Sequence, residues 1–457
     1  MSTSLTTTAP TPPGPTQDNN TLQSSAREQP SLPSVKLTNA FENTLRSMCA
    51  ESRSTIKETH HTRRACYGCT QSSTRPAQTV SRSSTTHARN PTCATSTLGG
   101  YSESPRTMCS IMTSSAPRTT PTLDDQFGRT ARDLRVSLTD RCNLRCTYCM
   151  PAEGLEWMPT DEALTDAEVI RLIRIGVEQL GIRQIRFTGG EPLLRKSLES
   201  IIRATKKFTT DQGQAPSIAL TTNGLGLEKR ASALAEAGLD RVNISLDTLD
   251  RHTFATLTRR DRLHDVFKGI EAANDAGLTP VKINSVLMPG INDGEILDLV
   301  NFALDSEVQL RFIEQMPLGP RERWSQAEMV TAEDILETMR SQFDLVPLQE
   351  QRGTAPAALW KVSDGTREGK IGVIASVTHP FCASCDRTRL TTDGAIRSCL
   401  FSAQREEMPL RDLMRGGASD ESLAKRWREA MWEKKQGHGI TSQGFVQPER
   451  LMSEIGG

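Results

Sequence analysis

Short apolar segments alternate with helix-like segments between residues 134 and 313, and this alternation constrains the fold more than any other feature. The expected strands are residues 134–138, 182–187, 217–220, 241–245, 281–287 and 309–313. Each has the length of a strand, and the segments between them are long enough to hold a helix. Six strand–helix units in this order predict a parallel sheet in an α/β fold.

The intervening segments carry helix signals. Thr165 and Glu168 form a capping box, apolar residues follow at helical spacing, and Gly181 ends the pattern. Residues 292–306 are another amphipathic segment. We therefore expect a partial (β/α)6 barrel of the TIM type at 123–345. We expect a C-terminal domain at 346–457 and a disordered N-terminal region at 1–122.

Polar motifs follow the ends of the expected strands. TGGEP comes after the second strand, TTNG closes the third, and Ser245 with Asp247 closes the fourth. Parallel α/β barrels carry their active sites at the carboxyl ends of the strands. Each motif alone is typical of a turn, but the series along one rim favours a binding site.

Three cysteines, Cys142, Cys146 and Cys149, have the spacing C-x3-C-x2-C, with Tyr148 before the third. Three thiolates can hold a [4Fe-4S] cluster and leave one iron open for a substrate or cofactor. The alternative is a zinc knuckle, which takes a fourth ligand from Cys or His. No histidine lies between residues 134 and 251, so a fourth ligand is missing locally.

A second triad, Cys382, Cys385 and Cys399, has the spacing C-x2-C-x13-C. A zinc ribbon would supply two C-x2-C pairs, and the partner pair is absent. Two incomplete triads favour two clusters, each with an open iron.

The two triads and several other motifs occur in the order found in the GTP 3',8-cyclases. These motifs are TGGEPLLR, TTNG, NISLD, VKIN, RFIE, FC-x2-C-x-R-x-R and a terminal Gly-Gly. The chain resembles that family of radical S-adenosylmethionine (SAM) enzymes from about residue 123 to its end. The resemblance implies a lyase that converts GTP to 3',8-cyclo-7,8-dihydro-GTP, the first step of molybdenum cofactor biosynthesis. It also implies two [4Fe-4S] clusters, SAM, an electron donor, a homodimer, and transfer of the product to cyclic pyranopterin monophosphate synthase.

The resemblance also assigns residues. The first triad would hold the cluster that binds SAM, and the second would hold a cluster that binds the guanine. Contacts to SAM are expected from Tyr148, Gly190, Glu191, Ser245 and Met316. Contacts to GTP are expected from Arg135, Arg186, Thr221, Lys282, Arg387, Thr388 and Arg389. Gly456 and Gly457 would enter the active site and assist catalysis.

The cationic residues also have a reading that does not depend on the resemblance. Arg135, Arg186 and Lys282 lie on expected strands, and Arg387 and Arg389 lie beside the second triad. Isolated arginines are mostly solvated surface groups, but the interior of a barrel is an unfavourable place for an unpaired charge. These residues therefore favour a phosphate site. Arg311 is also on a strand, without a specific role.

The first 120 residues differ from the rest, since 44 of them are Ser or Thr and they carry twelve Lys/Arg against six Asp/Glu. This composition predicts disorder and resembles a mitochondrial presequence, although the first twenty residues lack basic side chains. The expected location is the mitochondrial matrix, otherwise the cytoplasm. A CYGC pair at Cys66 and Cys69 is a weak metal or redox motif.

Composition excludes two classes. Lys+Arg and Asp+Glu both number 55, which argues against a globally basic nucleic-acid binder. The sequence has no run of 18 or more apolar residues, so we expect no transmembrane helix. Two alternative functions stay open: a radical SAM enzyme with an auxiliary cluster that acts on another substrate, such as a peptide, and a non-enzymatic iron–sulfur or zinc module.

Overall fold

The computed structural model describes residues 121–320, 324–348 and 352–456. The predictions of disorder and of a presequence, the CYGC pair, and Gly457 lie outside the described residues. The domain limits at 122/123 and 345/346 stay predictions.

A twelve-stranded sheet runs through the described part of the chain in the order β12-β11-β10-β1-β2-β3-β4-β5-β6-β9-β8-β7. Its central strands are parallel and are β1 (Asp133–Ser137), β2 (Gln184–Thr188), β3 (Ser217–Thr222), β4 (Arg241–Ser245), β5 (Lys282–Leu287) and β6 (Gln309–Glu314). These six strands confirm the predicted units to within two residues at each end. The α/β partial barrel is therefore confirmed.

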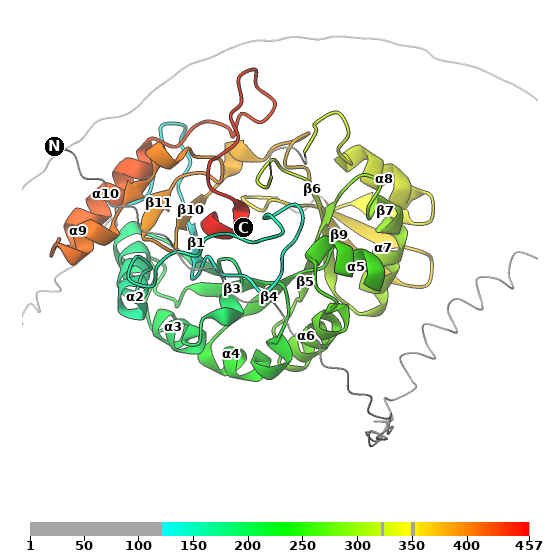
Figure 1. Ribbon diagram of the computed structural model, residues 1–457, viewed down its shortest axis with the longest axis horizontal. Coiled ribbons are helices and arrows are strands. Elements are labelled where there is room, and N and C mark those ends of the chain that lie inside the picture. The colour runs from blue at the N-terminus through cyan, green and yellow to red at the C-terminus, as the bar shows by residue number, and fades with distance from the viewer. Residues whose placement is uncertain (1–120, 321–323, 349–351, 457) are drawn as a thin grey trace, which may run out of the picture. The chain divides into compact units, whose positions relative to one another are not determined.

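Helices cover the outside of the curved sheet (Figure 1). They are α2 (Asp166–Arg174), α3 (Leu198–Thr205), α4 (Ala231–Ala237), α5 (Arg251–Thr258), α6 (Leu263–Asp275), α7 (Ile296–Asp305) and α8 (Ala332–Arg340). The capping box at Thr165 is present, because its hydroxyl accepts from Glu168 N–H and Glu168 returns to its backbone. The apolar faces of the helices bury residues such as Leu172 and Ile201 against the strands, and this packing supplies most of the core.

The C-terminal part extends both edges of the barrel. Strand β9 (Glu368–Ile374) pairs in parallel with β6, and β10 (Arg387–Leu390) pairs in parallel with β1. The remaining strands are β7 (Asp344–Pro347), β8 (Ala358–Ser363), β11 (Ala395–Arg397) and β12 (Met408–Pro409), and the remaining helices are α9 (Arg411–Arg415), α10 (Asp420–Trp432) and α11 (Met452–Ile455). The last helix lies inside the ring of strands (Figure 1). No described helix is long and apolar enough to span a bilayer.

Candidate active site

Both cysteine triads line one cavity of about 360 Å³ at the carboxyl ends of the central strands. The six cysteines are free and half-buried. More than 230 residues separate Cys149 from Cys382, and the pairing of β10 with β1 brings the two segments together. The sheet therefore creates a single site with a triad on each side.

The loop of the first triad is held by backbone contacts that require glycine. A Cβ atom at Gly190 would lie 2.2 Å from the Arg141 carbonyl oxygen, and Gly190 N–H donates to Thr139 at 2.6 Å. The Tyr148 hydroxyl donates to the Asp247 carboxylate at 2.7 Å. The GGEP motif and Asp247 thus fix the chain on either side of the cysteines.

The second triad is anchored by Arg129 and Glu314. Arg129 pairs with Asp125 at 2.5 Å and donates to the Cys382 carbonyl at 2.8 Å. The fully buried Glu314 carboxylate accepts from the N–H groups of Ala332, Val377 and Thr378, at 2.8, 2.8 and 2.9 Å. The latter two contacts fix the segment that leads into Cys382.

The sulfurs of neither triad form a site for a single metal ion in the described part of the chain. In the described ranges, no three His, Cys, Asp or Glu side chains are grouped so that they could hold one metal ion. Each cysteine of a [4Fe-4S] cluster binds a different iron, so the sulfurs of a triad need not converge on one point. The zinc alternative, which needs ligands about 2.3 Å from one ion, finds no support here.

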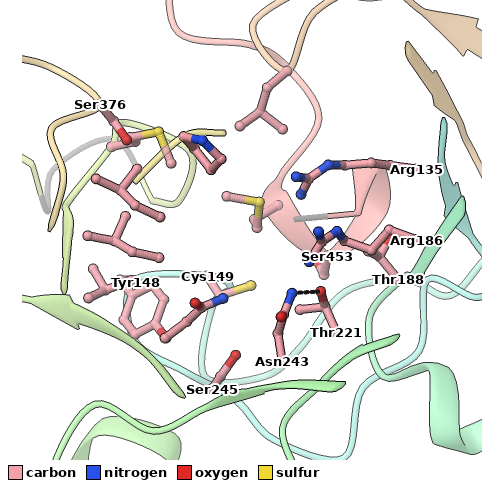
Figure 2. A pocket seen from close by; sticks show the side chains of 18 of the residues that line it. Arg135, Tyr148, Cys149, Arg186, Thr188, Thr221, Asn243, Ser245, Ser376 and Ser453 are labelled. Atoms are coloured by element: carbon pink, nitrogen blue, oxygen red, sulfur yellow. Dashed lines mark hydrogen bonds between the residues drawn. The ribbon is translucent and has the colours of Figure 1, made fainter. Parts of the chain in front are cut away.

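Arginines from three adjacent strands stand at one level of the barrel. Arg389 on β10 is in register with Arg135 on β1, and Arg135 is in register with Arg186 on β2. Figure 2 shows Arg135 and Arg186 projecting into the cavity from one wall, opposite Tyr148 and Cys149. Arg387, two positions before Arg389, and Arg311 on β6 also line the cavity. Five guanidinium groups therefore converge on one space.

These cations are short of anionic partners. Asp133 lies 3.9 Å from Arg135, and no other carboxylate in the described part of the chain pairs with any of the five arginines. Burial, with repulsion from neighbouring cations, lowers the pKa of Arg186 and of Arg389 to about 9 and that of Arg311 to about 10. The Nε atoms of Arg135, Arg186, Arg311 and Arg387 are buried without a hydrogen-bond acceptor. Such a cluster is stabilised when an anion with several oxygens enters it.

Acidic groups lie toward the first triad instead. Burial raises the pKa of Glu191 to about 7, although its carboxylate accepts from Thr222 Oγ1 at 2.7 Å and Asn223 N–H at 2.8 Å. Burial likewise raises the pKa of Asp247 to about 6. The site is therefore polarised, with acids beside the first triad and cations beside the second. A ligand with an ammonium or sulfonium group fits the first end, and a polyphosphate fits the other.

The C-terminal tail reaches into the cation cluster. The Gly456 carbonyl accepts a hydrogen bond from Arg389 Nη1 at 2.6 Å. Gly456 has φ +73°, and a Cβ atom there would lie 2.4 Å from Thr188 Oγ1. Ser453 and Met452 line the cavity. The glycine is thus required both by its backbone conformation and by its close approach to Thr188 and Ser137, at the ends of β2 and β1.

The other predicted site residues differ in their access to the cavity, and Glu191, which is buried with an exposed fraction of 1%, does not line it. Gly190, Thr221, Ser245 and Met316 line the cavity. Lys282 lies deeper in the barrel, where burial and then Arg311, Arg241 and Arg186 lower its pKa to about 7. Thr388 does not line the cavity, because its position on β10 is out of phase with its two arginine neighbours. Its buried hydroxyl accepts from Trp427 Nε1 at 3.0 Å.

The sequence reasoning missed several polar residues of the cavity. Asn243 and Asn284 lie on β4 and β5 at inward positions, and each has an unpartnered buried Oδ1. Asn243 donates to Thr221 Oγ1 at 3.3 Å (Figure 2). The period of two along strands that contain Ser245 and Lys282 would have identified both asparagines. No local pattern singled out Ser376 or Ser453.

Two family models match the chain consecutively. The Radical SAM superfamily matches residues 136–303, and Molybdenum Cofactor Synthesis C matches residues 308–440. The parallel partial barrel, the first cysteine triad and the superfamily match define a radical SAM enzyme. Membership in that superfamily implies a [4Fe-4S] cluster and SAM as cofactors.

Curated relatives give the narrower family. A protein of Corynebacterium glutamicum (strain ATCC 13032) named GTP 3',8-cyclase is 65% identical over 338 residues, which cover 73% of this chain and 89% of the relative. Proteins with the same name from Mycobacterium marinum and Streptomyces coelicolor are 55% and 56% identical and are covered to 95% and 96% of their lengths, over 76% and 73% of this chain. The chain therefore belongs to the GTP 3',8-cyclase family.

The crystal structure of Streptococcus suis SuiB aligns with a TM-score of 0.45 and 15% identity over 69% of each chain. The three relatives described above are bacterial, so they give no support to the predicted mitochondrial location.

Proposed function

We propose that this protein converts GTP to 3',8-cyclo-7,8-dihydro-GTP, the first step of molybdenum cofactor biosynthesis. The observation that carries the proposal is the group of five buried or half-buried arginines that line the same cavity as both cysteine triads, with one carboxylate partner among the described residues. GTP carries about four negative charges, and bidentate arginine contacts suit phosphate oxygens. The family's name and the charge of the cavity thus agree on the substrate.

The cations would orient the triphosphate. The Nε atoms of Arg135, Arg186 and Arg387 lack acceptors, so phosphate oxygens can accept from them without displacing a contact within the protein. Lys282 and Thr221 would complete the GTP site. The side chain of Thr388 faces Trp427. Thr388 would therefore contact the substrate only through its backbone, between Arg387 and Arg389.

The cysteines and the acidic end would hold the cofactors. Cys142, Cys146 and Cys149 would bind the [4Fe-4S] cluster, with SAM held by Tyr148, Gly190, Glu191, Ser245 and Met316. Cys382, Cys385 and Cys399 would bind a second [4Fe-4S] cluster next to the guanine. When bound, SAM and the first cluster would supply the radical chemistry that moves a hydrogen atom from C3' of the ribose to the 5'-deoxyadenosyl group. The C3'–C8 bond would form at the expense of the C8–N7 double bond of guanine, and one electron from the external donor and one proton would complete the 7,8-dihydro product.

The tail would shape the substrate site. Gly456 is held against Arg389 and lies against Ser137 and Thr188 at the ends of β1 and β2, where it would limit the positions open to the ribose and triphosphate. Gly457 follows it as a catalytic residue in this proposal. A side chain at Gly456 would meet Thr188 and Ser137 and would displace the tail from this position.

The family resemblance also supplies partners. We expect an external electron donor, a homodimer, and transfer of the product to cyclic pyranopterin monophosphate synthase. Because the compared relatives are bacterial, we place the reaction in the cytoplasm, the second compartment named from the sequence.

The test is anaerobic turnover of reconstituted protein with SAM and a strong reductant. 5'-Deoxyadenosine would be measured with GTP, with ATP and with no nucleotide. We expect GTP to stimulate its formation, together with a GTP isomer of unchanged mass. ATP has the same triphosphate and should not give an isomer. Cleavage of SAM that is indifferent to GTP would exclude this substrate and favour the peptide-modifying alternative.

A further inference from the structure

Lys434 is a buried lysine just beyond the C-terminal end of α10, with an exposed fraction of 3%. Taking an ammonium group out of water costs several kcal/mol unless its charge and its three N–H groups are compensated. The question is what compensates this one.

All three N–H groups of Lys434 have an acceptor in the second triad's segment. Nζ lies 2.8 Å from the Arg387 carbonyl oxygen, 3.2 Å from the Cys385 carbonyl oxygen and 3.4 Å from Cys385 Sγ. These three contacts match the donor capacity of an ammonium group. They tie the turn at Cys385 to the start of β10.

The charge of Lys434 has a single candidate partner. No carboxylate forms an ion pair with Lys434 anywhere in the described ranges, and two of its acceptors are neutral carbonyls. A cysteine that binds metal does so as a thiolate. The negative charge that balances Lys434 is therefore the Cys385 sulfur in its metal-binding form.

Lys434 reaches this sulfur from outside the cavity. It does not line the cavity, whereas Arg387, whose Nη1 lies 3.8 Å from the same sulfur, does. Cys385 thus lies between a cation on the substrate side and a cation behind it. By contrast, Cys399 Sγ accepts from the Phe401 backbone N–H at 3.5 Å. The three ligands of the second triad are not equivalent.

We propose that Lys434 is a positioning residue of the second triad, which fixes Cys385 and places its ammonium group behind the Cys385 sulfur. This inference rests on the proposed second cluster. Hydrogen bonds and positive charge at a ligand sulfur stabilise the reduced form of an iron–sulfur cluster and raise its reduction potential. Lys434 therefore sets the potential of the second cluster without touching the substrate.

The neighbouring residue provides a matched control. Lys435 pairs with Glu406 at 2.6 Å, and its side chain is 63% exposed. K435M removes the same charge one position away without altering a contact to the triad. K434R keeps the positive charge, whereas K434M and K434Q remove it. K434Q does so with a polar side chain, which is easier to bury than an unpaired charge.

The experiment isolates the second cluster. Full-length protein with C142A, C146A and C149A retains the second triad as its one described set of three cysteines, and the four variants would be made in this background. After anaerobic reconstitution, iron and sulfide content is measured, and the midpoint potential is determined by redox titration followed by electron paramagnetic resonance. Thermal melts of the variants identify any that fail to fold.

We expect K434M and K434Q to shift the midpoint potential to more negative values, with K434R and K435M close to the parent. A parent-like potential in both K434M and K434Q would overturn the role of Lys434, as would an equal shift in K435M. If the parent triple variant binds no iron and sulfide while its melt is normal, the second cluster itself is refuted, and the inference falls with it. The two negative results are distinguishable, because one is an unchanged midpoint potential and the other is the absence of bound iron and sulfide.

Discussion

Binding of GTP should draw a proton onto Lys282. Burial and the neighbouring arginines lower the pKa of its ammonium group to about 7 in the free protein. A triphosphate in the adjacent cation cluster would favour the charged form and return this pKa toward the usual value of about 10.4. The raised pKa in the complex means that binding is coupled to proton uptake above pH 7.

The magnitude follows from these two values. At pH 8 a group with a pKa of about 7 is about one-tenth protonated, so full protonation in the complex takes up about 0.9 proton. The affinity for GTP should fall by up to about tenfold for each pH unit above 7, until the pKa in the complex is reached. At pH 6 Lys282 is already charged and uptake through it should be about 0.1 proton.

Isothermal titration calorimetry measures this uptake directly. GTP would be titrated into reconstituted, unreduced protein at pH 8 in two buffers with different enthalpies of ionisation. The terminal phosphate of GTP is already ionised at this pH. K282M should bind more weakly and lose most of the uptake, whereas K370M serves as a control on β9. Equal uptake in K282M and in the parent would refute the assignment of the proton to Lys282.

Three further predictions concern the supports of the site. E314Q should lower the free energy of unfolding by about 2–3 kcal/mol, because an amide cannot satisfy all the donors around this buried carboxylate. The same change should reduce iron loading of the second triad. Urea melts test the first effect and iron assays test the second. G456A should lower product formation by about tenfold or more, because the added side chain would meet Thr188 and residue 456 has a positive φ. Turnover equal to that of the parent would contradict the tail geometry. R415M should lower stability slightly in urea melts at pH 7. The difference from the parent should vanish as the pH falls from 4.5 to 2, because the Arg415 hydrogen bond holds the pKa of Glu168 at about 2 and contributes only while that carboxylate is ionised.

The barrel strands could be predicted because each has a strong local pattern. Residues 241–245 were expected as a strand and form β4 with the same limits. Strands β9 and β10, which flank the six predicted strands, were not predicted as strands. The sequence of β10, RTRL, is that of a polar segment. Its burial comes from pairing with β1, a contact over a large sequence separation that no local pattern encodes.

The site residues also divide into those that a local sequence pattern predicts and those that only the fold brings to the site. Arg387 and Arg389 were expected to contact GTP, and both line the cavity. The alternation of side chains along β10 that places them there also turns Thr388 toward Trp427. Lys434 lies in the charged stretch 421–435, which reads as a surface helix. Only the fold shows that one lysine of this stretch is buried against Cys385.

The pairing of β1 with β10 has a consequence for synthesis of the chain. Asp133 pairs with Arg387, which leaves the ribosome about 250 residues later, or about 12–50 s at usual elongation rates. During that interval one edge of the nascent sheet has no strand beside it, and such an edge is open to pairing with other chains. The first triad can be translated and exposed long before the wall that faces it exists. Metal delivery that waits for chain release would avoid loading iron into half of a cavity.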